Sequence, residues 1–288
     1  MAHFNLLALA LAAVSAISAH PTNAPRAKKF GCGVEPTAQF LAQAQVIAAE
    51  EAANSTRAAQ QRSTNVAATV TIQTYFHVVA RSSAASEGYI PVEQLTQQLA
   101  VMNADYASSG FQFALAGTDY TINKSWASDG AELTMKRALR KGDYKALNIY
   151  FQYEIGGNFG YCYFPNRVSR GSSNFYYDGC TVLYSTVPGG SATDYNLGKT
   201  VTHEVGHWFG LFHTFQGNSC SGSGDSIADT PQQLSSTTGC PVGRDSCPNA
   251  AGVDPIHNYM DYSSDSCYES FTANQITRMS TYYNMYRA

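Results

Sequence analysis

The sequence predicts a mixed α/β fold followed by an irregular, cysteine-rich segment. Between residues 66 and 187, strand-like apolar segments alternate with segments of helical period, and this alternation favours a mixed sheet with helices packed against it. After about Gly217 the chain is instead rich in Gly, Ser, Asp and Pro and contains four cysteines. Hydrophobic residues make up 44% of the 288 residues, which is enough for a sizeable core.

The first residues have the composition of a secretory signal peptide. The segment from Phe4 to Ala19 is apolar and rich in small residues, with small side chains suited to cleavage after Ala16 or Ala19. It is too short to span a membrane. We therefore assign residues 1–19 to a signal peptide and expect a secreted protein; a buried N-terminal helix is the alternative.

Residues 20–65 have the composition of a propeptide rather than of a domain. The stretch contains Pro21, Pro25 and Pro36 and continues as an Ala- and Gln-rich run from position 38 to position 62. This run suits a polar, marginal helix and offers little material for a core. The folded unit is expected to cover residues 66–288.

Each element of the α/β part has its own signal. Residues 66–80 alternate β-branched and aromatic side chains, which predicts the first strand. Pro91 opens a helix in which Leu95, Leu99 and Met102 lie on one face. The other expected elements are a strand at 111–123, a helix at 131–142, a buried strand at 146–155, short strands at 159–164 and 180–187, and a final helix at 272–287.

The charge balance and apolar patterning exclude two classes of protein. There are 18 Lys and Arg residues against 21 Asp and Glu residues, a formal net charge of -3, so the chain lacks the basic footprint of a nucleic-acid binder. No uninterrupted apolar stretch is long enough to cross a membrane. Two N-x-Ser/Thr sequons, at Asn54 and Asn123, are predicted glycosylation sites of a secreted chain.

The segment HEVGHWFGLFH at 203–213 carries the clearest chemical signal. His203 and His207 lie four residues apart on an expected helix, so both imidazoles project from one face toward one point. Gly210 can take a positive φ at the helix end and bring His213 back to the same point. Three imidazoles with one open position are the ligand set of a catalytic zinc ion.

Glu204 lies about 100° around the helix from the first ligand, which places its carboxylate beside a zinc-bound water. Zinc lowers the pKa of such a water toward about 7. Glu204 can take the water proton as the water attacks a carbonyl and can pass it to the leaving amine, which predicts peptide-bond hydrolysis. The alternatives are a structural zinc or a helix without metal. His77 and His257 are expected to be structural, because a lone histidine is a poor ligand candidate.

The motif resembles that of the metzincin zinc endopeptidases, whose helix carries H-E-x-x-H-x-x-G-x-x-H and whose Met-turn underlies the metal. The segment NYMDY at 258–262 is similar to that turn; the resemblance implies Met260 as the Met-turn residue and Tyr262 as a group that stabilises the oxyanion. Together with GDSIADTPQQ at 224–233 and the cysteine pattern, the chain from Val66 to Ala288 resembles the pappalysin family in its secreted fungal branch.

This resemblance implies a metzincin-like α/β fold with two lobes. The upper lobe would hold a twisted mixed sheet and the zinc-binding helix, and the lower lobe would be irregular, tied by disulfides and closed by a C-terminal helix. A protein or peptide substrate is expected to lie extended between the lobes and to pair with an edge strand of the sheet.

Seven cysteines in a secreted chain are expected to be mostly paired, with one left over. Spacing alone does not choose among the pairings that six cysteines allow. The family resemblance implies the pairs Cys220–Cys247 and Cys240–Cys267 and leaves Cys162 with Cys180. The seventh, Cys32, lies between two glycines and could place a thiolate on the fourth zinc position, holding the enzyme latent as in some metzincin zymogens. The alternative is an incidental thiol or a mixed disulfide.

The resemblance also implies a calcium ion near Asp225, Asp229 and Thr230; a turn held by side-chain to backbone bonds is the alternative. As a whole, the sequence predicts a secreted metalloendopeptidase with one catalytic zinc ion, made as a preproenzyme. A zinc-containing binding module and a hydrolase of a non-protein amide are the other interpretations. Glu204 argues against the binding module, because a ligand cage needs no adjacent base.

Overall fold

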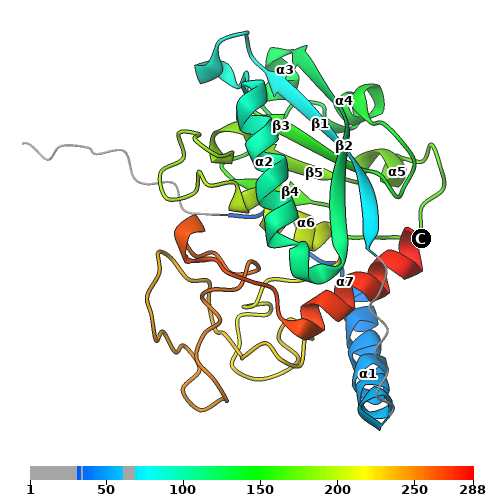
Figure 1. Cartoon of the computed structure of the whole chain (residues 1–288), viewed down its shortest axis with the longest axis vertical. Helices are drawn as coiled ribbons and strands as arrows, with labels where there is room; N and C mark the ends of the chain where they lie inside the picture. The colour runs from blue at the N-terminus through cyan, green and yellow to red at the C-terminus, as the bar shows by residue number, and fades with distance from the viewer. Residues whose placement is uncertain (1–30, 34, 61–68) are drawn as a thin grey trace, which may run out of the picture.

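A computed structural model describes residues 31–33, 35–60 and 69–288 (Figure 1). The predicted signal peptide lies outside these residues. Within them, no helix combines the length and the apolar character needed to cross a membrane. The elements are α1 (Ala38–Gln60), β1 (Val70–Ala80), α2 (Val92–Asp105), β2 (Phe111–Ile122), α3 (Lys124–Ala127), α4 (Glu132–Leu139), β3 (Leu147–Gln152), β4 (Gly160–Cys162), α5 (Ser173–Tyr177), β5 (Cys180–Leu183), α6 (Lys199–Trp208) and α7 (Ala273–Tyr286), with short 3₁₀ turns at Ala85–Glu87, Ala107–Ser109, Tyr184–Thr186 and Asp265–Cys267.

Five strands form one mixed sheet in the order β2-β1-β3-β5-β4. The first four are mutually parallel, and β4 runs antiparallel to β5 at one edge. Helical crossovers such as α2 connect the parallel strands, as parallel pairing requires. The predicted mixed sheet is confirmed. Strand β5 is shorter than the predicted strand at 180–187, because the chain turns into a 3₁₀ helix at Tyr184.

The main core lies between one face of the sheet and the helices α2, α6 and α7. Ile72, Phe76 and Val78 of β1 are buried in it, since alternate residues of a strand point to the same face. Leu95 and Met102 of α2 pack onto them, which confirms the apolar face predicted for this helix. The opposite face of the sheet is covered by α3 and α4 through Ala127 and Met135.

The chain between α6 and α7 forms the irregular lobe, drawn from yellow to orange in Figure 1. Two interleaved disulfides, Cys220–Cys247 and Cys240–Cys267, each close a separation of 27 residues. In the chain-entropy view such a closure contributes about 3.5 kcal/mol. A third bridge, Cys162–Cys180, joins β4 to β5. These are the three pairs that the family resemblance implies.

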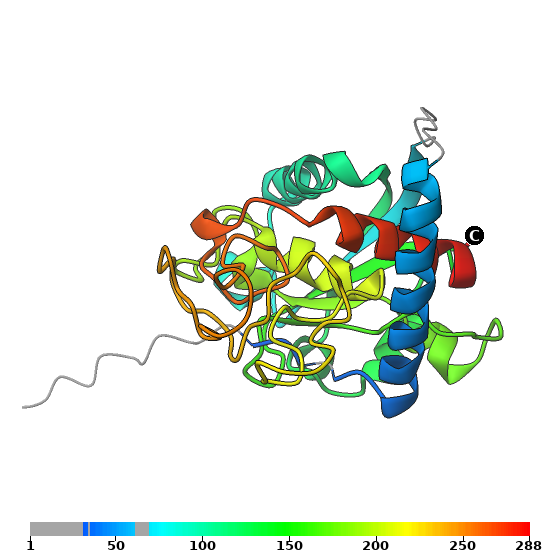
Figure 2. The same ribbon diagram turned by 90° about the horizontal axis from the view of Figure 1, so that it is seen from below.

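Helix α1 differs from its prediction. The Ala- and Gln-rich run was expected to be a marginal helix with little to contribute to a core, yet Phe40, Ala44 and Ile47 are buried against Phe212 and Tyr282. Figure 2 shows α7 crossing α1 at a steep angle. With the partly buried Leu41, four apolar positions make this contact, and they are too sparse to mark the run as part of a core.

The C-terminus is fixed to the end of α6 by a buried charge cluster. Arg287 donates from Nη2 to Asp178 Oδ1 at 2.7 Å and to the Trp208 carbonyl at 3.3 Å. Its guanidinium lies 3.6 Å from the centre of the Trp208 ring, a cation–π contact. Arg140 also pairs with Asp178, at 3.1 Å. The last turn of the chain therefore supports the helix that carries the HExxH motif.

We expect Arg287→Ala to destabilise the protein by roughly 3 kcal/mol, because it strips one partner from a buried carboxylate. The free energy of unfolding in urea measures the effect. Arg137→Ala, at an exposed position of α4, is the matched control and should change stability by less than about 0.5 kcal/mol. An Arg287→Ala protein as stable as this control would contradict the structural role given to the cluster.

Candidate metal centre

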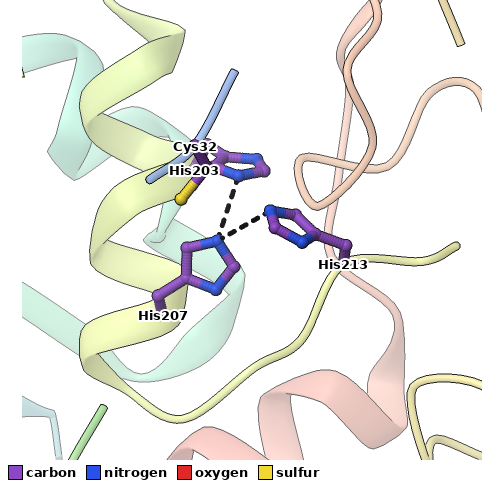
Figure 3. A group of neighbouring side chains, drawn as sticks. All are labelled: Cys32, His203, His207 and His213. Atoms are coloured by element: carbon purple, nitrogen blue, oxygen red, sulfur yellow. Dashed lines mark hydrogen bonds between the residues drawn. The ribbon is translucent and has the colours of Figure 1, made fainter. Parts of the chain in front are cut away.

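Helix α6 and the loop after it bring three histidines together. His203 and His207 project from α6 and His213 from the loop, and in Figure 3 their rings point toward a common position. The Nε2 atom of His207 lies 3.1 Å from Nε2 of His203 and 3.1 Å from Nε2 of His213. All three side chains are buried.

The return of His213 depends on the glycine at the end of the helix. Gly210 has a φ of 94°, as predicted, and its N–H donates to the His207 carbonyl at 2.8 Å. A Cβ at this position would stand 2.3 Å from the Tyr282 ring. Both the left-handed backbone and the close approach of α7 therefore require glycine here.

The backbone fixes the tautomers of two of these histidines. Nδ1 of His203 lies 2.7 Å from the Tyr259 carbonyl, and Nδ1 of His207 lies 2.7 Å from the Leu211 carbonyl. A carbonyl only accepts, so each Nδ1 carries the proton and each Nε2 presents a lone pair. Lone pairs that face each other at 3.1 Å repel unless a cation lies between them. Tetrahedral zinc ligands at roughly 2.0–2.1 Å lie about 3.3 Å from one another, so this donor set fits zinc.

Burial keeps these imidazoles neutral, the form that binds metal. It lowers the pKa of His207 to about 4, against the opposing effect of its hydrogen bond to the Leu211 carbonyl. Burial, followed by the proximity of the other histidines, also lowers the pKa of His203 and of His213 well below the usual value. None of the three needs to lose a proton at neutral pH before it can act as a ligand.

Glu204 follows the first ligand on α6 and is fully buried. Burial raises the pKa of its carboxyl well above the usual value, and a hydrogen bond from the Cys32 thiol, with Sγ 3.4 Å from Oε2, opposes this. A carboxylate with a raised pKa is a better proton acceptor. Its position beside the histidines matches the one expected from the helical spacing.

Gly160 forms a cradle for this carboxylate. A Cβ on Gly160 would lie 2.4 Å from Glu204 Oε1 and 2.5 Å from its Cγ. Strand β4 therefore approaches α6 so closely that no side chain fits between them. This role could not be predicted from the sequence, because only the fold of the sheet brings the two residues together.

We expect Gly160→Ala to lower kcat/KM by about 10²-fold, since a displacement of Glu204 by about 1 Å removes its alignment, while the three histidines keep their metal. Kinetics and metal content of the same preparation test this. Gly117→Ala on β2 is the control, because a Cβ there would meet only the Tyr75 ring at an ordinary 3.5 Å. Unchanged kinetics in Gly160→Ala would show that the carboxylate does not depend on this cradle.

Met260 packs against the helix that carries the histidines, and Tyr262 reaches the histidine cluster itself. Met260 is fully buried, and its Sδ packs so closely beneath α6 that a Cβ on Gly206 would stand 2.4 Å from it. The hydroxyl of Tyr262 lies 3.2 Å from Nε2 of His213. Of the two residues implied by the family resemblance, Met260 therefore packs on α6 and Tyr262 contacts a histidine of the cluster.

Cys32 completes the group. Its Sγ and the ring nitrogens of the three histidines all lie within 4.8 Å of one another. The backbone on either side pairs with the edge strand: Gly33 N donates to the Gly160 carbonyl at 3.0 Å, and Phe159 N donates to the Gly31 carbonyl at 2.9 Å. Cys32 N donates to the Tyr262 hydroxyl at 2.9 Å. Residues 31–33 thus occupy the edge at which a substrate strand was expected to pair.

The other two histidines named from the sequence lie outside this group. His77 is buried between Asp119, at 2.8 Å, and Asn148, at 2.9 Å. His257 Nδ1 lies 2.6 Å from the Cys267 carbonyl. Both sets of contacts are those of structural residues, as expected.

The turn that contains Asp225 and Asp229 has side-chain to backbone hydrogen bonds, as the alternative to a calcium site requires. Asp229 accepts from the Thr272 hydroxyl at 2.6 Å and from Asn274 N at 3.0 Å, at the start of α7. Asp225 accepts from Ile227 N at 3.0 Å, and burial raises the pKa of its carboxyl to about 8. Both oxygens of Asp229 are therefore engaged by the protein.

A supporting network behind His203 has no signal in the sequence. Asp105, at the end of α2, accepts from the Tyr259 hydroxyl at 3.0 Å and from the Thr202 hydroxyl at 2.6 Å. Since the Tyr259 carbonyl receives the His203 Nδ1 proton, Asp105 helps to orient that imidazole through Tyr259. Asp105 lies about a hundred positions before the histidine motif, so the sequence alone does not indicate that the two are close in space.

Comparison with known proteins places this site in a family. The family model described as pregnancy-associated plasma protein-A, peptidase family M43, matches residues 137–284. An extracellular metalloprotease of Colletotrichum graminicola is 62% identical over 90% of this chain and 91% of its own length. One from Sordaria macrospora is 53% identical over 97% of each chain.

Solved structures give the same result. Mature mirolysin of Tannerella forsythia, in complex with a cleaved peptide, superposes with a TM-score of 0.64 at 29% identity, covering 76% of this chain and 93% of its own. A promirolysin mutant from the same organism superposes with a TM-score of 0.66 at 27% identity, covering 88% and 94%. With the matching model, the similar sequences and the histidine cluster in agreement, this chain belongs to the M43 (pappalysin) family of metallopeptidases.

Proposed function

We propose that the protein is a secreted zinc endopeptidase that is made as a latent proenzyme, with His203, His207 and His213 as the zinc ligands. The observation that carries the proposal is the convergence of three histidine Nε2 atoms beside a buried carboxylate. The extracellular metalloproteases among its relatives support secretion.

A zinc ion bound to the three imidazoles would supply a Lewis acid and a water of lowered pKa. Glu204 accepts the proton of the attacking water and later delivers it to the leaving amine. The Tyr262 hydroxyl, next to His213, donates to the oxyanion that develops on the scissile carbonyl. Met260 supports the ligands from below α6. Strand β4 pairs with the extended substrate and sets the carbonyl in register.

Residues 20–65 act as the propeptide in this proposal, and residues 66–288 as the catalytic domain. Two observations support this division. The promirolysin mutant covers more of this chain than mature mirolysin does, 88% against 76%. Residues 31–33 also lie on β4, where they block strand pairing by a substrate. Cys32 would supply its thiolate to the bound metal and would thereby keep the catalytic water out.

Cys32→Ser should raise the activity of the proenzyme by about tenfold, because a hydroxyl is a far weaker zinc ligand than a thiolate. The activity should stay below that of the processed enzyme, since the backbone of residues 31–33 still covers β4. Initial rates on a fluorogenic peptide, before any processing is visible on a gel, measure the change. A Cys32→Ser proenzyme as inactive as the wild type would refute the switch.

Digestion of casein or gelatin tests the proposed function. Processed enzyme should cleave these proteins, and o-phenanthroline should stop the cleavage. A zinc-containing binding module would show metal without cleavage. A hydrolase of a non-protein amide would show chelator-sensitive amide hydrolysis that leaves casein intact.

Calcium binding near Asp225, Asp229 and Thr230 stays a prediction; each oxygen of Asp229 accepts one hydrogen bond at the start of α7. Glycosylation at Asn54 and Asn123 stays a prediction. Asn123 accepts through Oδ1 from Ser125 N and Trp126 N at the start of α3, and these bonds leave the amide nitrogen available for a glycan.

A further inference from the structure

Helix α1 covers a surface that adjoins the metal centre. The buried face of α1 contacts aromatic residues from three places: the loop after α6 that carries His213, the segment after β4, and α7. We call this group, together with the buried Arg278 of α7, the α1-docking surface. Its residues are Phe164, Phe212, Arg278, Tyr282 and Tyr286.

The contact is largely one between aromatic rings, which meet stacked, tilted and edge-on. Phe40 lies 5.0 Å from the ring of Phe164, 5.7 Å from that of Phe212 and 5.2 Å from that of Tyr282. Phe164 in turn lies 5.4 Å from the ring of His207, and Phe212 directly precedes His213. The helix therefore packs against the residues that flank two of the metal ligands.

A buried ion pair fixes the helix farther along. Arg278, whose side chain is 1% exposed, meets Glu51 of α1 with Nη2–Oε2 at 2.9 Å and with Nε at 3.1 Å from each carboxylate oxygen. The Thr281 hydroxyl also donates to Glu51, at 3.1 Å. A bidentate contact between a guanidinium and a carboxylate fixes the orientation of α1 as well as its position.

The N-terminal segment is thus attached at two places, on β4 through residues 31–33 and on the α1-docking surface through α1. We propose that α1 retains the inhibitory segment after the chain is cut beyond Gln60, so that a nicked proenzyme stays latent until α1 leaves the α1-docking surface. This inference rests on the proposed function. Because the two attachments are linked by only a few residues, each holds the other at a high effective concentration.

Release is expected to be effectively one-way. A single helix with few apolar side chains is marginal in water, and most of its helical order comes from packing. Once the fragment has left, it must order again to rebind, which costs conformational entropy. Activation therefore depends on removal or digestion of α1 rather than on the first cut.

The full proenzyme, with a recognition sequence for an unrelated specific protease inserted directly after Gln60, tests this inference. After cutting, the N-terminal fragment should co-elute with the enzyme in gel filtration. Activity should stay about 10²-fold below that of the enzyme freed of the fragment. If the fragment elutes separately and full activity appears at once, the inference is wrong.

Substitutions in α1 test whether retention of the fragment depends on the face of α1 that packs on the α1-docking surface. Ile47→Asp places a charge in the buried face, so its fragment should dissociate on cutting and full activity should appear. Val46→Asp is the matched control, because Val46 is 59% exposed, and it should behave as the wild type. Glu51→Gln removes the ion pair with little change in shape, so its cut fragment should be retained less well than the wild-type fragment on dilution and better than the Ile47→Asp fragment. This milder variant tests the docking even if the Ile47→Asp chain does not fold.

The readouts distinguish this inference from the proposed function. Co-elution reports docking whether or not the chain is a protease. If the Ile47→Asp fragment dissociates and no cleavage of casein follows, the proposed function fails while the docking stands. If all cut variants, wild type included, are equally active, the docking inference fails while the protease assignment stands.

Discussion

Glu204→Gln is expected to lower kcat/KM for peptide cleavage by at least about 10³-fold while the zinc content stays unchanged. The amide of Gln cannot accept the proton of the attacking water. Its shape matches that of the carboxylate, so it still fits the space beside Gly160. The loss therefore measures proton transfer rather than packing. Single-turnover kinetics together with metal analysis of the same preparation give both quantities.

Glu93→Gln is the matched control, because Glu93 is an exposed residue in the first turn of α2 and is not part of the histidine cluster. Its kinetics should equal those of the wild type. A Glu204→Gln enzyme that keeps more than about a tenth of wild-type kcat/KM would remove Glu204 from the role of general base.

His207→Ala is the second large effect we expect: loss of the zinc ion and, with it, of peptidase activity by more than about 10³-fold. The Nε2 atom of His207 lies 3.1 Å from Nε2 of His203 and 3.1 Å from Nε2 of His213. Without it, two imidazoles remain, which is fewer than the three protein ligands of a catalytic zinc site. Equilibrium dialysis against zinc, followed by elemental analysis, measures the change.

His257→Ala controls for the removal of a histidine as such. His257 contacts the Cys267 carbonyl and lies outside the metal cluster, so this variant should keep one zinc ion and its activity. If His207→Ala bound zinc with wild-type affinity, the metal would have to lie elsewhere. Circular dichroism of both variants would separate metal loss from unfolding.

The parts of this protein that local spacing determines could be predicted from the sequence. Two histidines four residues apart share a helix face wherever that helix lies, and Gly210 signals the reversal that returns His213. The same holds for the apolar face of α2, where Leu95 and Met102 needed only the helical period. Strand β1 was expected from its alternation, which its burial follows from Val70 to Phe76; from Phe76 to Ala80 every residue is buried, because the sheet is covered on both faces there.

Contacts between residues distant in the sequence could not be predicted in this way. Gly160 and Glu204 meet because the edge strand passes over α6, and no local pattern marks a glycine whose neighbour is forty-four positions away. Asp105 reaches Tyr259 across 154 residues for the same reason. Helix α1 was underestimated because three buried side chains in a polar run carry the contact, and their partners lie near the other end of the chain.

Anomalous diffraction at the zinc absorption edge, from crystals of the secreted protein, tests the central claim most directly. The account predicts one strong peak at roughly 2.0–2.1 Å from the Nε2 atoms of His203, His207 and His213, with Glu204 beside it but not bound. An absence of anomalous density at that point, or imidazole rings that point away from one another, would contradict it.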